Sequence, residues 1–155
     1  MNNQRRTVLK SGSGAALLGM LAAAGIITPG MALADWNKAA FDAKSMADTL
    51  KALGAGSPAD SKDVQVTGPD IAENGAVVPV GVATSLPNVS MLAILVEKNP
   101  NALAATFTLP ADTEANVQTR IKMGQTSNIY ALVKSGDKFF MATKEIKVTL
   151  GGCGG

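Results

Sequence analysis

The only thiol of this chain lies almost at its C-terminal end. Cys153 is the single cysteine among 155 residues, and it stands in the terminal segment GGCGG. A cysteine reacts as its thiolate, and an ordinary thiol with a pKa of about 8.5 is only a few per cent ionised at neutral pH. The neighbouring sequence offers no base and no cation, and the terminal carboxylate of Gly155 disfavours the thiolate. We therefore expect a partner protein to activate this thiol.

Four glycines surround the thiol, namely Gly151, Gly152, Gly154 and Gly155. Glycine has the widest backbone freedom of the amino acids, and it has no side chain that would obstruct a narrow channel. Five extended residues reach about 17 Å at roughly 3.5 Å per residue. Residues 151–155 are therefore predicted to form a swinging arm that carries Cys153 into the active sites of other proteins, as in a covalent carrier.

Residues 1–34 have the pattern of an export signal. The paired Arg5 and Arg6 precede an apolar run, residues 15–27, and the small-x-small triplet at 32–34 predicts cleavage directly after it. The run is too short for a spanning helix, which needs about 20 residues. The arginine pair and the glycine- and alanine-rich run favour the twin-arginine pathway, with an ordinary Sec signal as the alternative. We expect the mature protein in the periplasm.

Several known uses of a terminal cysteine or glycine pair do not fit this tail. Prenylation requires the cysteine to be fourth from the end, whereas Cys153 is third. Bacterial lipid attachment uses an N-terminal cysteine. Ubiquitin-like sulfur carriers end in Gly-Gly, but their activation consumes ATP and does not need a cysteine. An unpaired cysteine in an exported chain otherwise indicates pairing with another subunit, and this alternative stays open.

The charge of the chain gives no reason to expect nucleic-acid or membrane binding. Residues 1–34 hold three of the 14 basic residues and no acidic one, so residues 35–155 hold 11 basic and 12 acidic residues. The basic isoelectric point, about 8.8, therefore belongs to the signal. Nucleic acids and anionic membrane surfaces bind proteins through an excess of positive charge, which is absent after residue 34.

The rest of the chain offers few residues for catalysis or metal binding. It has no histidine, the commonest general base and metal ligand. Asp112 and Glu114 lie in a turn-like segment, where solvated surface is a better interpretation than a catalytic pair. The four methionines after the signal are expected to fill the core. We expect no metal and no cofactor, and a protein that acts as a carrier rather than as an enzyme.

Residues 35–56 have the pattern of an amphipathic helix. Asp35 is a suitable N-cap, and Gly54 and Gly56 are expected to end the helix. Apolar residues fall near one face while lysines and aspartates take the other. The apolar residues are Trp36, Ala39, Ala40, Met46, Leu50 and Leu53. This helix is expected to pack on the rest of the domain or on a partner.

Residues 57–150 predict an immunoglobulin-like antiparallel β-sandwich of about seven strands. Short β-like runs alternate with turn signals at spacings of about 8–12 residues. Pro79 inside one run indicates an edge or a bulge, and residues 88–99 are apolar on both faces, as in a central strand. The seven segments are 63–68, 75–85, 88–99, 102–110, 115–124, 127–136 and 138–150.

The chain resembles the SoxY family, the sulfur-carrying subunits of the periplasmic thiosulfate-oxidising Sox system. The export signal, the N-terminal helix, the predicted sandwich and the terminal GGCGG carry the resemblance, together with the segment ILVEKNPNALAATFTLP at residues 94–110. The resemblance therefore extends over the whole chain.

The resemblance implies roles that composition and spacing do not. In the family, a haem-containing enzyme joins the cysteine that matches Cys153 oxidatively to thiosulfate, and a hydrolase then releases sulfate. A sulfur dehydrogenase, in the systems that have one, oxidises the remaining sulfane. The family also implies a heterodimer with SoxZ, a second β-sandwich protein.

An exported sandwich module that uses Cys153 for disulfides between subunits is the alternative function. Mass spectrometry distinguishes the two, because sulfur-containing adducts on Cys153 indicate a carrier, whereas a homogeneous disulfide dimer indicates the module.

Overall fold

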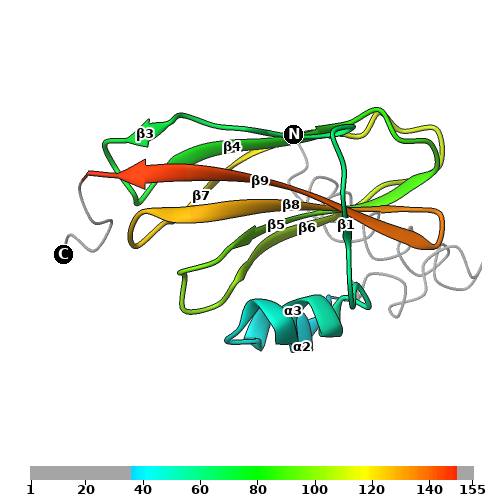
Figure 1. Cartoon of the computed structure of the whole chain (residues 1–155), viewed down its shortest axis with the longest axis horizontal. Helices are drawn as coiled ribbons and strands as arrows, with labels where there is room; N and C mark the ends of the chain where they lie inside the picture. The colour runs from blue at the N-terminus through cyan, green and yellow to red at the C-terminus, as the bar shows by residue number, and fades with distance from the viewer. Residues whose placement is uncertain (1–35, 150–155) are drawn as a thin grey trace, which may run out of the picture. The chain divides into compact units, whose positions relative to one another are not determined.

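The computed structural model describes residues 36–149, which contain two short helices and nine strands. The described residues from Asn37 onward belong to one compact unit. Its strands form two sheets, and helices α2 (Lys38–Asp42) and α3 (Met46–Ala52) cover one face of the larger sheet (Figure 1). The predicted export signal lies outside the described residues. No helix in the described range has the length and apolarity needed to cross a membrane.

The segment predicted as one helix over residues 35–56 folds as two helices. Ala43 takes an extended conformation (φ −60°, ψ 135°) after α2, and Ser45 begins α3. The Ser45 hydroxyl accepts a hydrogen bond from the Asp48 N–H at 3.1 Å and donates one to the Asp48 carboxylate at 2.7 Å. This reciprocal cap favours a new helix start at Ser45 over a continuous helix.

Helix α3 ends at a glycine, as the sequence predicts. Gly54 has a φ of 76°, and the Ala55 N–H donates to the carbonyl oxygen of Leu50 at 2.8 Å, which is the pattern of a Schellman motif. Of the residues predicted for the apolar face, Ala40 is buried and Met46, Leu50 and Leu53 are partly buried on the larger sheet, whereas Trp36 and Ala39 are exposed.

The larger sheet has the strand order β1-β9-β8-β5-β6, and β3 also pairs with β9. Its strands are β1 (Ala59–Asp60), β3 (Ile71–Ala72), β5 (Val89–Val96), β6 (Leu103–Thr108), β8 (Ser127–Ser135) and β9 (Lys138–Val148). Strands β6, β5, β8 and β9 are antiparallel neighbours, whereas β1 and β3 run parallel to β9. The long strand β9 therefore has β8 on one side and two short strands on the other.

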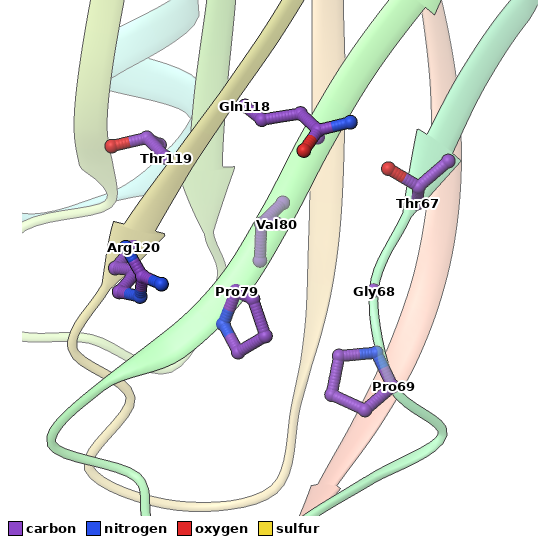
Figure 2. Close-up of a pocket in the computed structure, with 9 residues that line it drawn as sticks. Thr67, Gly68, Pro69, Pro79, Val80, Gln118, Thr119 and Arg120 are labelled. Atoms are coloured by element: carbon purple, nitrogen blue, oxygen red, sulfur yellow. The ribbon is translucent and has the colours of Figure 1, made fainter.

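The smaller sheet has the order β2-β4-β7, in which all neighbours are antiparallel. Its strands are β2 (Val64–Thr67), β4 (Val78–Thr84) and β7 (Asn116–Ile121). Strand β4 is thus central, although it contains Pro79. Strand β2 pairs with β4 only as far as Gly81, so Pro79 lies beyond the end of β2 (Figure 2).

The backbone direction at Pro79 explains why a proline is tolerated there. The carbonyl oxygen of Pro79 lies 3.3 Å from the position that a Cβ on Gly68 would take. Gly68 directly follows β2, so this carbonyl points to the β2 side of β4, beyond the last β2 residue. The nitrogen and oxygen of a strand residue face the same neighbour. The missing N–H of Pro79 therefore removes no hydrogen bond to β7, and Pro79 has an edge-like position within a central strand.

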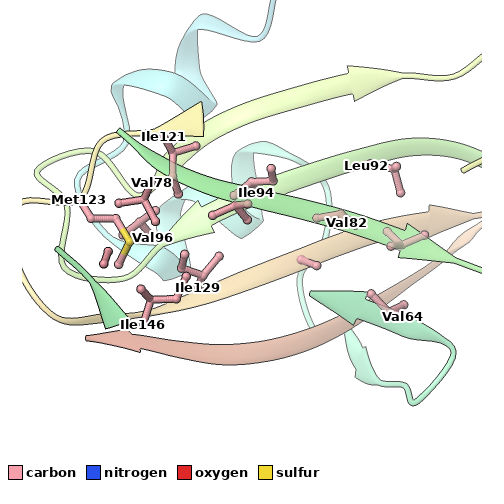
Figure 3. Close-up of a cluster of buried hydrophobic side chains, with 14 of the residues drawn as sticks. Val64, Val78, Val82, Leu92, Ile94, Val96, Ile121, Met123, Ile129 and Ile146 are labelled. Carbon is pink, nitrogen blue, oxygen red and sulfur yellow. The ribbon is translucent and has the colours of Figure 1, made fainter. Parts of the chain in front are cut away.

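The main apolar core lies between the two sheets (Figure 3). Alternate residues of β5, Leu92, Ile94 and Val96, face this core. The residues between them, Ala93 and Leu95, face the helices in a second apolar cluster. Strand β5 is therefore buried on both faces, as its apolar sequence predicts.

The predicted β-sandwich is confirmed, and each of the seven predicted segments contains a strand. Strands β1 and β3 are not predicted, because two residues are too short to show a period. They also make the pairing less uniform than predicted, since both are parallel to β9. The last predicted strand segment extends to Leu150, whereas β9 ends at Val148 and Leu150 lies outside the described residues.

Candidate functional site

The site residues predicted from the sequence lie outside the described residues. Cys153 and the four glycines around it follow Thr149, the last described residue, while Arg5 and Arg6 precede the first. What the described residues show is how the sandwich holds the end of β9, the strand that precedes Cys153 in the sequence.

Strand β3 holds the end of β9 from one side. The Lys147 N–H donates to the carbonyl oxygen of Asp70 at 3.0 Å, and the Thr149 N–H donates to the carbonyl oxygen of Ala72 at 3.1 Å. Ala72 is itself buried in the main core. The backbone is thus paired as far as Thr149, four residues before Cys153.

The other side and the inner face of the β9 end are also held. The Val148 N–H donates to the Thr126 hydroxyl at 2.9 Å. Ile146 is completely buried in the main core. A Cβ on Gly68 would come within 2.9 Å of the Ile146 Cδ1 atom, so a larger residue at Gly68 would require the end of the Ile146 side chain to shift. The segment that bears Cys153 therefore begins from a fixed point of the sandwich.

One ion pair joins the two strands at this point. Lys144 Nζ lies 2.8 Å from Asp70 Oδ1, and the Asp70 side chain is exposed. The hydrogen bond from Lys144 lowers the pKa of Asp70, and the charges of Lys144 and then of Lys147 lower it further. An exposed pair of this kind contributes little to stability, because water screens the charges.

We expect Lys144→Gln to raise the pKa of Asp70 towards its ordinary value, as measured by NMR titration of the carboxyl group. Because the folded-state pKa is lowered, the pair contributes stability above the unfolded-state pKa and loses it as the pH falls through the folded-state value. The native chain and the variant should therefore converge in stability in acid. Lys138→Gln, at the other end of β9, is the matched control. An unchanged Asp70 titration in Lys144→Gln would mean that the pair does not form in solution.

The acidic pair considered in the sequence lies far from the β9 end. Asp112 and Glu114 are exposed in the loop between β6 and β7. The antiparallel order of β6, β5, β8 and β9 places this loop at the opposite end of the sandwich. Residues 36–149 contain no group of three or more histidine, cysteine or acidic residues that could hold a metal ion.

The methionines of the described chain are packing residues. Met123 is completely buried in the main core, and Met46 and Met91 pack against the cluster below the helices. Met141 is partly buried in β9. The sequence places Met123 in a strand, whereas the structure places it just after β7, where its N–H donates to the carbonyl oxygen of Gly75 at 2.7 Å.

A shallow depression of about 400 Å³ lies where β2 leaves β4 (Figure 2). Pro69 and Pro79 form its apolar part, and Thr67, Gln118 and Arg120 supply polar groups. The lining contains neither an acid nor a thiol, so it offers no carboxylate base and no second thiol for the chemistry of Cys153.

Comparison with known proteins identifies the chain's family. A family model described as sulfur oxidation protein SoxY matches residues 50–153, which is more than half of the chain. The chain belongs to the SoxY family. The match runs through all nine described strands and ends at the single cysteine, and it confirms the SoxY identity expected from the sequence.

A solved SoxY structure supports the same assignment. The chain is similar to a structure of the sulfur carrier protein SoxY from Chlorobium limicola f thiosulfatophilum, with 35% sequence identity and a TM-score of 0.63. The similarity covers 74% of this chain and 100% of the Chlorobium chain. A comparison with curated proteins gave no match.

Sequence reasoning missed the part of this SoxY-family fold that holds the end of β9. The bonds come from the backbone of Asp70 and Ala72, whose pairing with β9 spans more than 70 residues of sequence. The predicted strand segment 63–68 indicated only that a strand ends near Gly68. An exposed Ile71 next to a buried Ala72 is too short a pattern to predict a strand.

Proposed function

We propose that this SoxY-family chain is a periplasmic sulfur carrier that holds thiosulfate-derived intermediates covalently on Cys153. The observation that carries the proposal is that the family match ends at Cys153, four residues after Thr149, the last residue whose backbone is bonded to the sandwich. The similar Chlorobium protein is described as a sulfur carrier. A fixed strand end followed by a glycine-rich tail is suited to presenting a thiol at a defined distance from the body.

The proposed chemistry starts with an oxidation. The Cys153 thiol and thiosulfate form an S–S bond, giving a cysteine S-thiosulfonate, and they release one proton and two electrons to a haem-containing partner. Water then attacks the terminal sulfonate sulfur and breaks the S–S bond to it, which releases hydrogen sulfate and leaves a persulfide on Cys153. The carrier needs no catalytic group of its own for either step, because the partner enzymes act on the bound group.

The proposed partners follow from the family. The chain forms a heterodimer with SoxZ and makes transient contacts with the loading enzyme, the sulfate-releasing hydrolase and, where present, a sulfur dehydrogenase. The nearly neutral charge of residues 35–155 supports protein partners rather than nucleic acids or anionic membranes.

Intact-protein mass spectrometry tests the function. Purified chain is incubated with thiosulfate and the loading enzyme, and the mass is measured before and after reduction. Reducible additions of thiosulfate or sulfur, mapped to Cys153, are expected. A homogeneous disulfide dimer with no such addition would contradict the carrier function and favour an exported module that is crosslinked through Cys153.

We expect the double variant Gly152→Val and Gly154→Val to slow turnover with the Sox enzymes while Cys153 still reacts normally with iodoacetamide. β-Branched residues widen and stiffen the backbone, so entry into narrow active sites suffers more than access of a small reagent. The matched control is the pair Gly56→Val and Gly124→Val, because a Cβ on either glycine has no heavy atom within 4 Å. Equal losses in both assays of the tail variant would mean that the glycines act on the intrinsic reactivity of the thiol.

We expect Arg5→Lys and Arg6→Lys together to retain the chain in the cytoplasm, because the twin-arginine pathway reads the arginine pair. Cell fractionation measures the location of this chain and of SoxZ. If the folded heterodimer is exported as a unit, SoxZ is retained as well. Lys10→Arg, which keeps the pair and the positive charge, is the control. SoxZ that still reaches the periplasm while this chain does not would contradict joint export.

A further inference from the structure

Strand β6 forms a free edge of the larger sheet within the described chain. The strand order ends at β6 on one side and at the two-residue strands β1 and β3 on the other. Figure 1 shows β6 at the margin of the sheet, on the side of helices α2 and α3. The edge strands of the smaller sheet are β2 and β7.

The backbone of β6 presents hydrogen-bonding groups outwards. The Leu109 N–H donates to the carbonyl oxygen of Ser90 at 3.0 Å, so Leu109 faces β5. In an antiparallel pair, every second residue faces the same neighbour. Phe107 therefore faces β5 as well, and Thr106 and Thr108 direct their N–H and C=O groups away from the sheet. Neither of these threonines has a hydrogen-bond partner on that side among residues 36–149.

The outer half of this edge, Ala105–Thr108, lacks the charges, prolines and bulges that usually protect a strand from pairing. Its sequence, Leu-Ala-Ala-Thr-Phe-Thr, contains no charge and no proline, whereas the β7 edge carries Arg120. The register shift between β5 and β6 lies at the Leu103 end, so Ala105–Thr108 remain regular. Free edges are normally shielded by charges, prolines or bulges because an exposed regular strand pairs with other chains.

We propose that β6 is the docking edge for the partner subunit, and that a strand of SoxZ adds to it and extends the larger sheet. The complementary chemistry is that of an extended strand, since main-chain donors and acceptors at Thr106 and Thr108 are satisfied by another main chain. The identity of the partner rests on the proposed function.

The position of β6 agrees with the task of the tail. Three strand spacings separate β6 from β9, about 14 Å at roughly 4.8 Å each, and an added strand lies about 19 Å away. A strand added at β6 thus lies on the far side of the larger sheet from the β9 end.

Hydrogen exchange gives the direct test. The amides of Thr106 and Thr108 are expected to exchange fast in the free chain and to slow by about tenfold or more when SoxZ binds, because strand pairing closes them from water. Gln118 is the reference on the β7 edge. The Thr84 N–H donates to the carbonyl oxygen of Ala115 at 3.0 Å, so Gln118 faces away from β4 and its amide should stay unprotected.

Matched substitutions provide the second test. Thr106→Pro removes an outward N–H and no bond to β5, and Thr108→Lys adds a charge to the edge. Each is expected to weaken SoxZ binding about tenfold or more, as loss of one or two main-chain hydrogen bonds would. Gln118→Pro and Gln118→Lys make the same changes on β7 and should leave affinity within about twofold. Circular dichroism and thermal melts show which variants are folded.

The outcomes separate this inference from the carrier function. Folded β6 variants that bind SoxZ like the native chain, or protection at Gln118 instead of Thr106, would overturn the β6 assignment. Sedimentation that shows a dimer of this chain which Thr106→Pro dissociates, while SoxZ still binds that variant, would also overturn it. A native chain that loads sulfur on Cys153 but does not bind SoxZ overturns the inference and leaves the carrier function standing.

Discussion

Replacing Cys153 with serine is expected to abolish sulfur loading while the melting temperature stays unchanged. The stability of the sandwich comes from the apolar clusters of the described chain, and exchange of one sulfur for oxygen at residue 153 alters none of their members. A serine hydroxyl forms no stable bond to sulfane sulfur, so no intermediate can be held. Mass spectrometry after incubation with the loading enzyme measures the effect.

A relocated thiol is the control for this prediction. Cys153→Ser combined with Ser57→Cys places one thiol on an exposed part of the body. It should react with iodoacetamide but should not be loaded by the Sox enzymes. Loading of the Ser57→Cys thiol would show that position on the tail is unimportant. A melting temperature of Cys153→Ser that falls by more than a few degrees would show that Cys153 has a structural role.

Ile146→Ala is expected to lower the free energy of unfolding by about 2–5 kcal/mol, because it leaves a cavity where a fully buried side chain packed. Ile146 lies near the end of β9 and belongs to the main core. Its Cδ1 atom packs close to Gly68. Urea denaturation measures the change. Lys147→Ala, at the exposed neighbouring position, is the matched control and should change stability by less than about 0.5 kcal/mol.

This prediction separates the stability of the β9 end from its chemistry. Below the unfolding transition, Ile146→Ala should still load sulfur on Cys153, because the variant keeps the backbone bonds from Lys147 to Asp70 and from Thr149 to Ala72. A loss of less than about 1 kcal/mol would indicate that the core collapses around the cavity. A loss of loading in the folded variant would instead mean that packing at Ile146 controls where the thiol is presented.

Local sequence patterns were sufficient for much of the fold. The seven longer strands follow from alternation and turn residues, because the period of side chains along a strand is a property of consecutive residues. The break between α2 and α3 was equally local: Ser45 and Asp48 have the spacing of a capping pair, and the single-helix prediction overlooked it. The Gly54 helix end was predicted and found.

The sequence by itself determined where the only thiol lies, that the chain has a β-sandwich pattern behind an export-like segment, and that it resembles SoxY. Those features depend on residue types and on neighbours along the chain. Only the tertiary structure decided that Asp70 and Ala72 hold the end of β9, that β2 ends before it reaches Pro79, and that β6 is a free edge of the described sheet. Strand neighbours are chosen by pairing between distant segments, and the period of a strand indicates which face is buried but not which strand lies beside it.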